Sequence, residues 1–198
     1  MANQNNTTEE KYVMVLDVET TGFPTRRNAF PYYSKLYDNA RIIEIAYILI
    51  DKAGNTIKEV SHLVKSGSKI ENSHIHGITN EMVDADGISM EAVFDEMMVD
   101  LQKVDTLMAH NLDFDYSVIL SEAYRKYANN RLLLSQLYGK QLYCTMIKGQ
   151  HHMKQKKYPK LKELYEFLYE GETWEQTHRA LDDVRTCVRC YQKMERKA

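Results

Sequence analysis

Short apolar runs dominate the first third of the chain, and their pattern predicts β-strands. Residues 11–18 (KYVMVLDV), 41–51 (RIIEIAYILID) and 56–65 (TIKEVSHLVK) are rich in the valine, isoleucine and tyrosine typical of strands. The second and third runs are separated by residues 52–55 (KAGN), whose residue types suit a hairpin turn. The sequence therefore predicts three antiparallel strands early in the chain.

A helical period replaces this pattern after residue 79 and continues to about residue 103. Its apolar stripe, which predicts the core-facing side of a helix, consists of Met90, Val93, Phe94, Met97, Met98 and Leu101. Further along, the pattern predicts strands at 106–111 and 142–145 and helices at 112–128, 161–169 and 178–194. Three strands followed by alternating helices and strands predict an α/β fold with a mixed central sheet flanked by helices.

Composition narrows the class of protein to a single globular domain with one site. The chain has 198 residues, of which 43% are hydrophobic and 27% charged. Its longest apolar run, residues 42–50, is too short to span a bilayer. Residues 1–10 lack the basic start and apolar stretch of a secretory signal. We therefore expect a disordered polar leader at 1–10, one domain at 11–196, an intracellular location and no membrane segment.

The cysteines argue against a disulfide framework. There are three of them, Cys144, Cys187 and Cys190, which is an odd number in a chain without a secretion signal. Cys187 and Cys190 form a C-x-x-C inside a predicted helix, with no preceding strand and turn and no further ligands. We therefore interpret them as packing residues in preference to a redox or zinc site.

Carboxylates stand at three places where a strand ends or a helix begins. Asp17 and Glu19 are two positions apart in the first strand, so their side chains project from the same face. Asp115 lies in the first turn of the helix that follows the fourth strand, and Asp183 comes five positions after His178. Each acid alone also fits a solvated strand end or a favourable helix-dipole contact. Together they predict one acidic site at the sheet edge where α/β proteins bind ligands.

These segments closely resemble the three motifs of the DEDDh family of 3′–5′ exonucleases, over about residues 11–194. The motifs lie at 17–22 (DVETTG), 110–115 (HNLDFD) and 178–183 (HRALDD). Residues 76–79 (HGIT) add a similarity, for which a turn with a helix cap by Thr79 is the alternative to a role near the terminal nucleotide. Asp182 stays open as a residue that caps or pairs locally.

The resemblance implies a ribonuclease H-like fold with a five-stranded sheet and phosphodiester hydrolysis by two divalent ions, Mg²⁺ or Mn²⁺. Hard cations prefer oxygen ligands, and two of them stabilise the attacking and leaving oxygens of an in-line displacement. We expect Asp17 to bridge both ions, Glu19 and Asp183 to complete one site and Asp115 to serve the other. His178 is then the expected general base that takes a proton from the attacking water.

Two segments are candidates for the substrate track. Residues 148–162 have six lysines and no acid, and are either a phosphate track or a solvated basic loop ahead of a helix. Residues 22–40, with several tyrosines and no clear period, are either a surface insertion or an aromatic loop that stacks on bases. The full set of expected substrate contacts is Thr20, Thr21, His76, Ile78, Asn111, Lys154, Lys156, Lys157 and Tyr158.

The function we expect is removal of 5′-mononucleotides from the 3′ end of single-stranded DNA, or of frayed or mismatched duplex DNA. The net charge of −2 does not oppose this, because bound cations present positive charge to phosphate. RNA trimming stays open, since discrimination depends on contacts to the 2′-hydroxyl. A non-catalytic nucleic-acid-binding module also stays open, although it would not need all five residues. The partner would be nucleic acid with a free 3′ end, met by the chain alone, as a homodimer, or with a polymerase in replication or repair.

Overall fold

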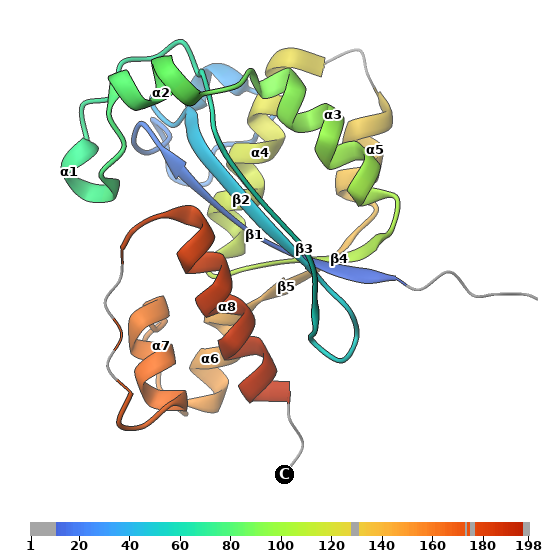
Figure 1. Cartoon of the computed structure of the whole chain (residues 1–198), viewed down its shortest axis with the longest axis vertical. Coiled ribbons are helices and arrows are strands. Elements are labelled where there is room, and N and C mark those ends of the chain that lie inside the picture. The colour runs from blue at the N-terminus through green and yellow to red at the C-terminus, as the bar shows by residue number, and fades with distance from the viewer. Residues whose placement is uncertain (1–10, 128–130, 173, 175–176, 196–198) are drawn as a thin grey trace, which may run out of the picture.

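The computed structural model describes residues 11–127, 131–172, 174 and 177–195. The expected leader at 1–10 and the last residue of the expected domain lie outside this range. Within it, the chain folds around one mixed sheet with helices on both faces (Figure 1). This confirms the fold class predicted from the sequence.

The sheet has five strands in the order β3-β2-β1-β4-β5. They are β1 (Tyr12–Thr20), β2 (Ile42–Ile50), β3 (Thr56–Leu63), β4 (Val104–Ala109) and β5 (Gln141–Cys144). The first three strands are antiparallel as predicted, whereas β4 pairs parallel with β1 and β5 parallel with β4. Because β1 has a neighbour on each side and helices on each face, nearly all of its apolar side chains are buried.

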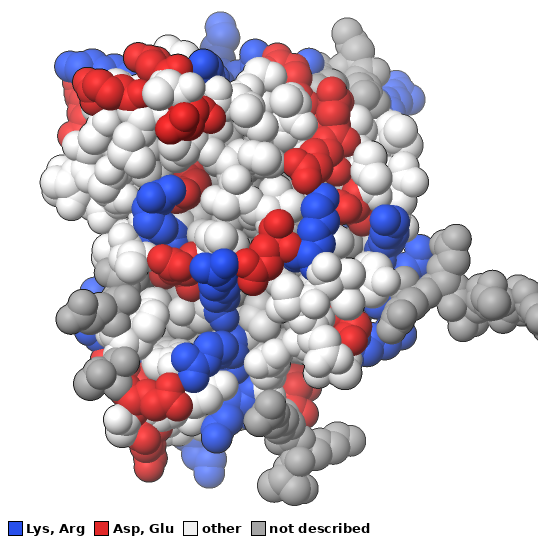
Figure 2. Space-filling view, in the orientation of Figure 1, with Lys and Arg blue, Asp and Glu red and all other residues white. Residues whose placement is uncertain are grey.

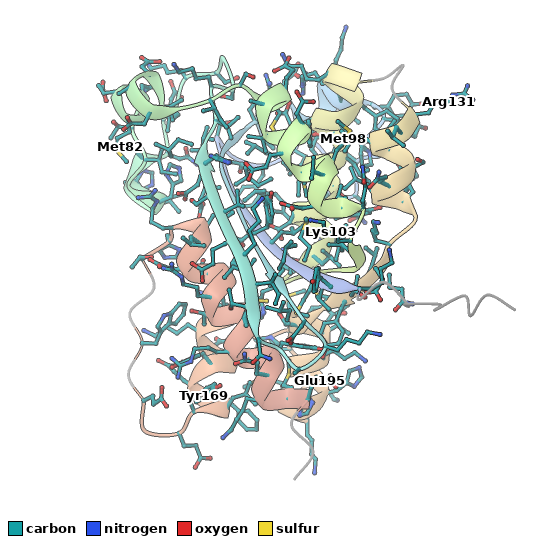
Figure 3. The ribbon with its side chains drawn as sticks, turned by 45° about the vertical axis from the view of Figure 1, so that its right-hand side comes forward. Met82, Met98, Lys103, Arg131, Tyr169 and Glu195 are labelled. Carbon is teal, nitrogen blue, oxygen red and sulfur yellow. The ribbon has the colours of Figure 1, made fainter. Side chains whose placement is uncertain are left out.

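Two groups of helices cover the two faces of the sheet (Figure 1). One face packs against α3 (Met90–Leu101), α4 (Leu112–Tyr127) and α5 (Arg131–Tyr138), and the other against α6 (Thr145–His152), α7 (Leu161–Leu168) and α8 (Ala180–Glu195). The short helices α1 (Ser73–His76) and α2 (Asn80–Asp86) lie beyond the end of the sheet. Side chains fill the space on both sides of the strands (Figure 3).

The alternation of side chains along β1 decides which layer each residue meets. Met14, Leu16 and Val18 belong to the apolar core under α3, α4 and α5. Val13 and Val15 belong to the core under α7 and α8. Because strand side chains alternate between faces, the odd-numbered positions that follow, 17 and 19, face the α8 side.

The helix predicted from residue 79 to about 103 is two helices, and this part of the prediction was wrong. The break lies at residues 87–89, where Ile88 N–H donates to Leu63 O at 2.9 Å and Ser89 caps α3 by accepting from Ala92 N at 3.2 Å. Gly87 permits the break, since a Cβ at this position would lie 2.4 Å from Val83 O. The apolar stripe correctly located α3, but its period did not reveal the short pairing with the sheet.

Further helices occupy segments that carried no helical prediction: α1, α5, α6 and the 3₁₀ turn Ser34–Tyr37. The lysine-rich segment therefore begins in the end of α6 and finishes in the first turn of α7, and only residues 153–160 between them are a loop. Gly149 lets α6 approach α7 closely, because a Cβ there would lie 2.7 Å from Leu164 Cδ1.

The two cysteines of the C-x-x-C are buried on α8 against the sheet, which confirms their interpretation as packing residues. Among the described helices, none is long and apolar enough to cross a membrane.

Candidate active site

Three carboxylates converge where β1 ends. Asp17 and Glu19 project from β1 toward the α8 layer, and Asp183 lies in the first turn of α8. One ligand oxygen from each of the three acids lies within 4.8 Å of the others. The structure therefore brings together acids that are about 165 residues apart in sequence, as the strand-and-helix argument predicted.

Asp115 reaches the same place from the opposite layer. It is buried in the first turn of α4, and its Oδ1 accepts a hydrogen bond from Val18 N–H at 3.2 Å. Val18 stands between Asp17 and Glu19, so this bond fixes Asp115 beside both acids. Asp115 is outside the 4.8 Å group, but its negative charge raises the pKa of Asp17 and of Glu19.

Burial and mutual repulsion make these acids hard to ionise together. Desolvation is the largest cause, and it raises the pKa of Glu19 to about 8 and that of Asp115 to about 8. The pKa of Asp17 is raised well above its usual range by desolvation and by the charges of its neighbours. Several carboxylate oxygens lie close together here and repel one another when they are ionised. Such a group fits a hard divalent cation such as Mg²⁺ or Mn²⁺, which binds oxygen ligands.

Glu44 is a fifth acid at this site, and sequence reasoning missed its role. It faces Glu19 across the β1–β2 pair, and its side chain is only 1% exposed. Arg179 donates to it through Nε at 3.0 Å and Nη2 at 2.6 Å. The signal was present in the sequence, since Glu44 interrupts a wholly apolar strand, but its partner is 135 positions away. The forked pair offsets a charge that would otherwise oppose Glu19 directly.

The same carboxylate holds the start of α8. Ala180 N–H donates to Glu44 Oε2 at 2.9 Å, so Glu44 satisfies a free N–H at the helix N-terminus. The helix therefore begins at Ala180, and not at residue 178 as predicted. Glu44 and Arg179 thus anchor the turn that carries His178 on one side and Asp183 on the other.

His178 is exposed and lies just outside α8 with a φ of 52°. Within the described part of the chain, no hydrogen bond or ion pair joins it to the acids. It is near His76, whose pKa is lowered mainly by desolvation and, among the nearby charges, by His178. The structure places His178 at the rim of the site, and its role as general base stays a prediction.

Residues 76–79 form the turn that the sequence predicted. Thr79 caps α2 by accepting from Met82 N at 3.3 Å, and His76 Nδ1 accepts from Ile78 N at 3.1 Å. His76 is buried, and Ile78 is fully buried in a small apolar cluster. Their predicted contact with a terminal nucleotide stays a prediction.

Thr20 and Thr21 make hydrogen bonds within the chain. The hydroxyl of Thr20 donates to Gly22 O at 2.7 Å. That of Thr21 donates to Asn39 O and accepts from Arg41 N–H, both at 3.0 Å. These bonds close the base of residues 22–40, and contact of either threonine with substrate stays a prediction.

A cavity of about 810 Å³ opens at the N-terminal end of α4, the helix that carries Asp115. Residues of the 22–40 segment line one side, and Asn111, Asp113, Phe114 and Ser117 line the other. Phe23 and Phe114, which both line it, are in contact with ring centroids 5.7 Å apart. The 22–40 segment therefore borders a hollow at the start of the helix that carries Asp115, and neither phenylalanine was singled out in the sequence.

The lysine-rich segment reaches the site from the β4 side. His110 Nε2 donates to Pro159 O at 3.0 Å, and burial lowers the pKa of His110 to about 4, so its ring is neutral. Lys157 pairs with Glu163 at 3.1 Å. Lys154, Lys156 and Tyr158 are exposed. Phosphate contact by this segment stays a prediction.

Acids delivered by β1, α4 and α8 to one edge of a mixed sheet define a class, the exonucleases with a ribonuclease H-like fold. The chain matches the RNase T family model, described as an exonuclease, over residues 14–191, and it belongs to this family of phosphodiester hydrolases. The family implies divalent metal ions, in agreement with the oxygen donors described above. No curated protein sequence matches the chain.

Solved structures share the fold. Escherichia coli Exonuclease I in a zinc-bound complex with single-stranded DNA is 17% identical with a TM-score of 0.71, covering 94% of this chain and 40% of that one. The same enzyme in complex with a dA16 oligonucleotide is 16% identical with a TM-score of 0.72, and the match covers 94% of this chain and 41% of that one. Exonuclease I from Methylocaldum szegediense is 19% identical with a TM-score of 0.64, and the match covers 94% of this chain and 41% of that one. The chain thus spans about two fifths of the length of these proteins.

The raised pKa values predict that the metal-free protein loses stability as pH rises. Glu19 and Asp115 have ordinary values of 4.5 and 3.8 and values of about 8 when folded. The folded state therefore holds protons that the unfolded state releases between these limits. In chelator, we expect the melting temperature to fall from about pH 5 to about pH 8.5. Glu19→Gln should flatten the decline, and a melting temperature that rises over this window would contradict the prediction.

Because Glu44 is buried, its replacement is expected to lower the free energy of unfolding more than the replacement of an acid in a surface ion pair. Glu44→Gln keeps the shape but removes the charge that Arg179 and Ala180 meet, and we expect a loss of about 2 kcal/mol in unfolding free energy, measured with urea. The Arg179 side chain is 40% exposed, which keeps the loss below that of a fully buried pair. The matched control is Glu59→Gln at the exposed Arg185 pair, expected to cost less than about 1 kcal/mol. Equal losses would refute the anchoring role.

Proposed function

We propose that this chain is a metal-dependent 3′–5′ exonuclease that releases 5′-mononucleotides from single-stranded DNA, or from frayed or mismatched duplex ends. The observation that carries the proposal is the convergence of Asp17, Glu19 and Asp183 within 4.8 Å, with Asp115 held beside them. These acids repel one another, so clustering them costs free energy. A module that only bound nucleic acid would gain nothing from this cluster.

Asp17 would bridge two divalent ions, Mg²⁺ or Mn²⁺, with Glu19 and Asp183 completing one site and Asp115 the other. When bound, such ions offset the negative charge that develops on the attacking and leaving oxygens. The chain must first release the protons that the raised pKa values of Glu19 and Asp115 retain near neutral pH. Ion binding is therefore expected to strengthen as pH rises toward about 8.

His178 would accept the proton of the attacking water. Its exposed position at the rim leaves it free of internal hydrogen bonds in the described structure, and the Glu44–Arg179 pair holds the turn from which it projects. Arg179 itself is engaged by Glu44, so the positive charge beside the acids serves the scaffold. The base and the metal ligand Asp183 are thus fixed by one anchor.

Single-stranded DNA is the preferred substrate because Escherichia coli Exonuclease I, which shares the fold, has been crystallised with dA16 and dT13 oligonucleotides. The cavity at the start of α4, which is lined by Phe23 and Phe114, supports it further. An unpaired terminal base can stack on aromatic rings, whereas a base inside a duplex cannot reach them.

A comparison of matched substrates tests the function. We expect Mg²⁺-dependent release of mononucleotides from 3′-labelled single-stranded DNA and from a 3′-labelled mismatched duplex end, slower release from RNA, and none in chelator. Asp17→Asn is the inactive control. Metal-independent release would refute the mechanism, faster cleavage of RNA would refute the DNA preference, and binding without release from any substrate would show a non-catalytic module.

His178→Ala tests the assignment of the base. Loss of general-base catalysis predicts a fall in kcat of about 10²- to 10⁴-fold, while stabilisation by Mg²⁺ in a thermal shift remains at the parental level. His74→Ala, which removes an exposed histidine from the neighbouring helix α1, is the matched control and should keep the parental rate. Parental turnover in His178→Ala would remove the base assignment.

A further inference from the structure

A row of aromatic rings extends from the cavity over the α4–α5 side of the molecule. We call it the aromatic ladder, and it consists of the exposed rings of Phe30, Tyr32, Tyr33 and Tyr138, joined by the half-buried ring of Tyr124. Ring centroids are 5.8 Å apart for Phe30 and Tyr32, 4.0 Å for Tyr32 and Tyr33, and 6.5 Å for Tyr32 and Tyr124. The hydroxyls of Tyr124 and Tyr138 are 3.0 Å apart. The ladder is therefore one continuous surface.

Four of the five rings are exposed although they are large and mostly apolar. Phe30, Tyr32, Tyr33 and Tyr138 are 65%, 52%, 56% and 53% exposed. Single exposed rings are common, but a contiguous group marks an interaction surface.

The ladder is held on a fixed base. Arg125 of α4 donates to Ser34 O at 2.8 Å and to Asp38 at 2.7 Å, and Tyr37 is buried with its hydroxyl donating to Ala29 O. The 22–40 segment is thus attached to α4, and its rings are presented in place before any partner binds.

The ladder is continuous with the candidate active site. Phe30 lines the same cavity as Phe114, which is next to Asp115. Helix α4 carries both Asp115 and Tyr124, nine positions apart. At 1.5 Å per residue this is roughly 14 Å along the helix, which is the length of about four stacked nucleotides.

The charges beside the ladder suit a polyanion. Arg26, Arg27 and Lys35 lie in the same segment, are exposed, and form no ion pair with any described residue. On the face over β3 and α8, by contrast, basic and acidic side chains are interspersed (Figure 2), and cations there pair with acids, as in Lys58–Glu96 and Arg185–Glu59. Exposed rings interleaved with uncommitted cations are the pattern of a single-strand binding surface.

We propose that the aromatic ladder binds the stretch of single-stranded nucleic acid that lies upstream of the 3′-terminal nucleotides. Bases stack on the rings, and Arg26, Arg27 and Lys35 neutralise the phosphates between them. The inference rests on the proposed function, since it assumes that the 3′ end lies at the acids. Three exposed cations without an ion pair to any described residue favour a polyanion over a protein partner. The ladder makes the enzyme sensitive to substrate length and tolerant of sequence.

The test compares substrates that do and do not reach the ladder. In Tyr32→Ala/Tyr33→Ala we expect KM to rise about tenfold on single-stranded DNA of about twenty nucleotides and less than about twofold on one of about three, since each lost stacking contact weakens binding by at least several-fold. Tyr32→Phe/Tyr33→Phe keeps the rings and should retain the parental KM. The matched control is Phe167→Ala, which removes an exposed ring from α7.

A second measurement separates this inference from the proposed function. Binding of a fluorescent twenty-nucleotide DNA, measured in chelator, needs no turnover and should weaken about tenfold in Tyr32→Ala/Tyr33→Ala. If the parental protein cleaves nothing, the proposed function fails, and this measurement still decides on the ladder.

Four results would overturn the ladder. They are parental affinity in the alanine variant, an equal loss on short and long substrates, a length-dependent loss found only in Lys154→Ala/Lys156→Ala, and a parental dimer that the alanine variant disperses without any change in DNA affinity. The third result would assign the upstream strand to the lysine-rich segment, and the fourth would make the ladder an interface between two copies.

Discussion

The repulsion among the acids at the end of β1 is the constraint on which the rest of the structure depends. Each of these carboxylates raises the free energy of ionising the others, and desolvation raises it further. Such an arrangement persists only where the surrounding scaffold holds it. The central strand supplies two acids with buried neighbours on both sides, and one helix from each covering layer supplies another. Both layers must therefore be in place before the cluster exists.

The balance of charge around the cluster is local. Glu44 adds a fifth carboxylate, which is buried, and Arg179 meets it with a forked pair of hydrogen bonds, so that its charge is balanced within the fold. Among the described residues, no arginine forms such a forked pair with Asp17, Glu19 or Asp115. The site thus has two parts. The Glu44–Arg179 pair balances its own charge, whereas the cluster of Asp17, Glu19, Asp115 and Asp183 would be stabilised by a bound cation. Glu44 differs from the other acids because it lies at the N-terminus of α8, where Ala180 N–H also donates to it.

The fold could be predicted because its patterns are local. Short apolar runs identified the first three strands, and a spacing of two placed Asp17 and Glu19 on one face, as the structure confirms. Long-range contacts were hidden. The break at Gly87 depends on Ile88 pairing with the end of β3, and the start of α8 depends on Glu44, 136 positions earlier. A periodic pattern records which face is buried, but it does not record which distant group ends a helix.

The hydrogen bonds of Thr21 have a consequence for how this molecule can change. Its hydroxyl joins Asn39 and Arg41, and its backbone N–H donates to Arg41 O at 2.9 Å, so both ends of the 22–40 segment meet at one point. Because its two ends are held together by hydrogen bonds, a change of conformation within the segment is expected to move β1 and β2 little. Its length and composition are free to vary while the positions of the acids stay constant. With the binding role proposed for the 22–40 segment, substrate reach and bond cleavage would be separable traits, carried by neighbouring stretches of the same chain.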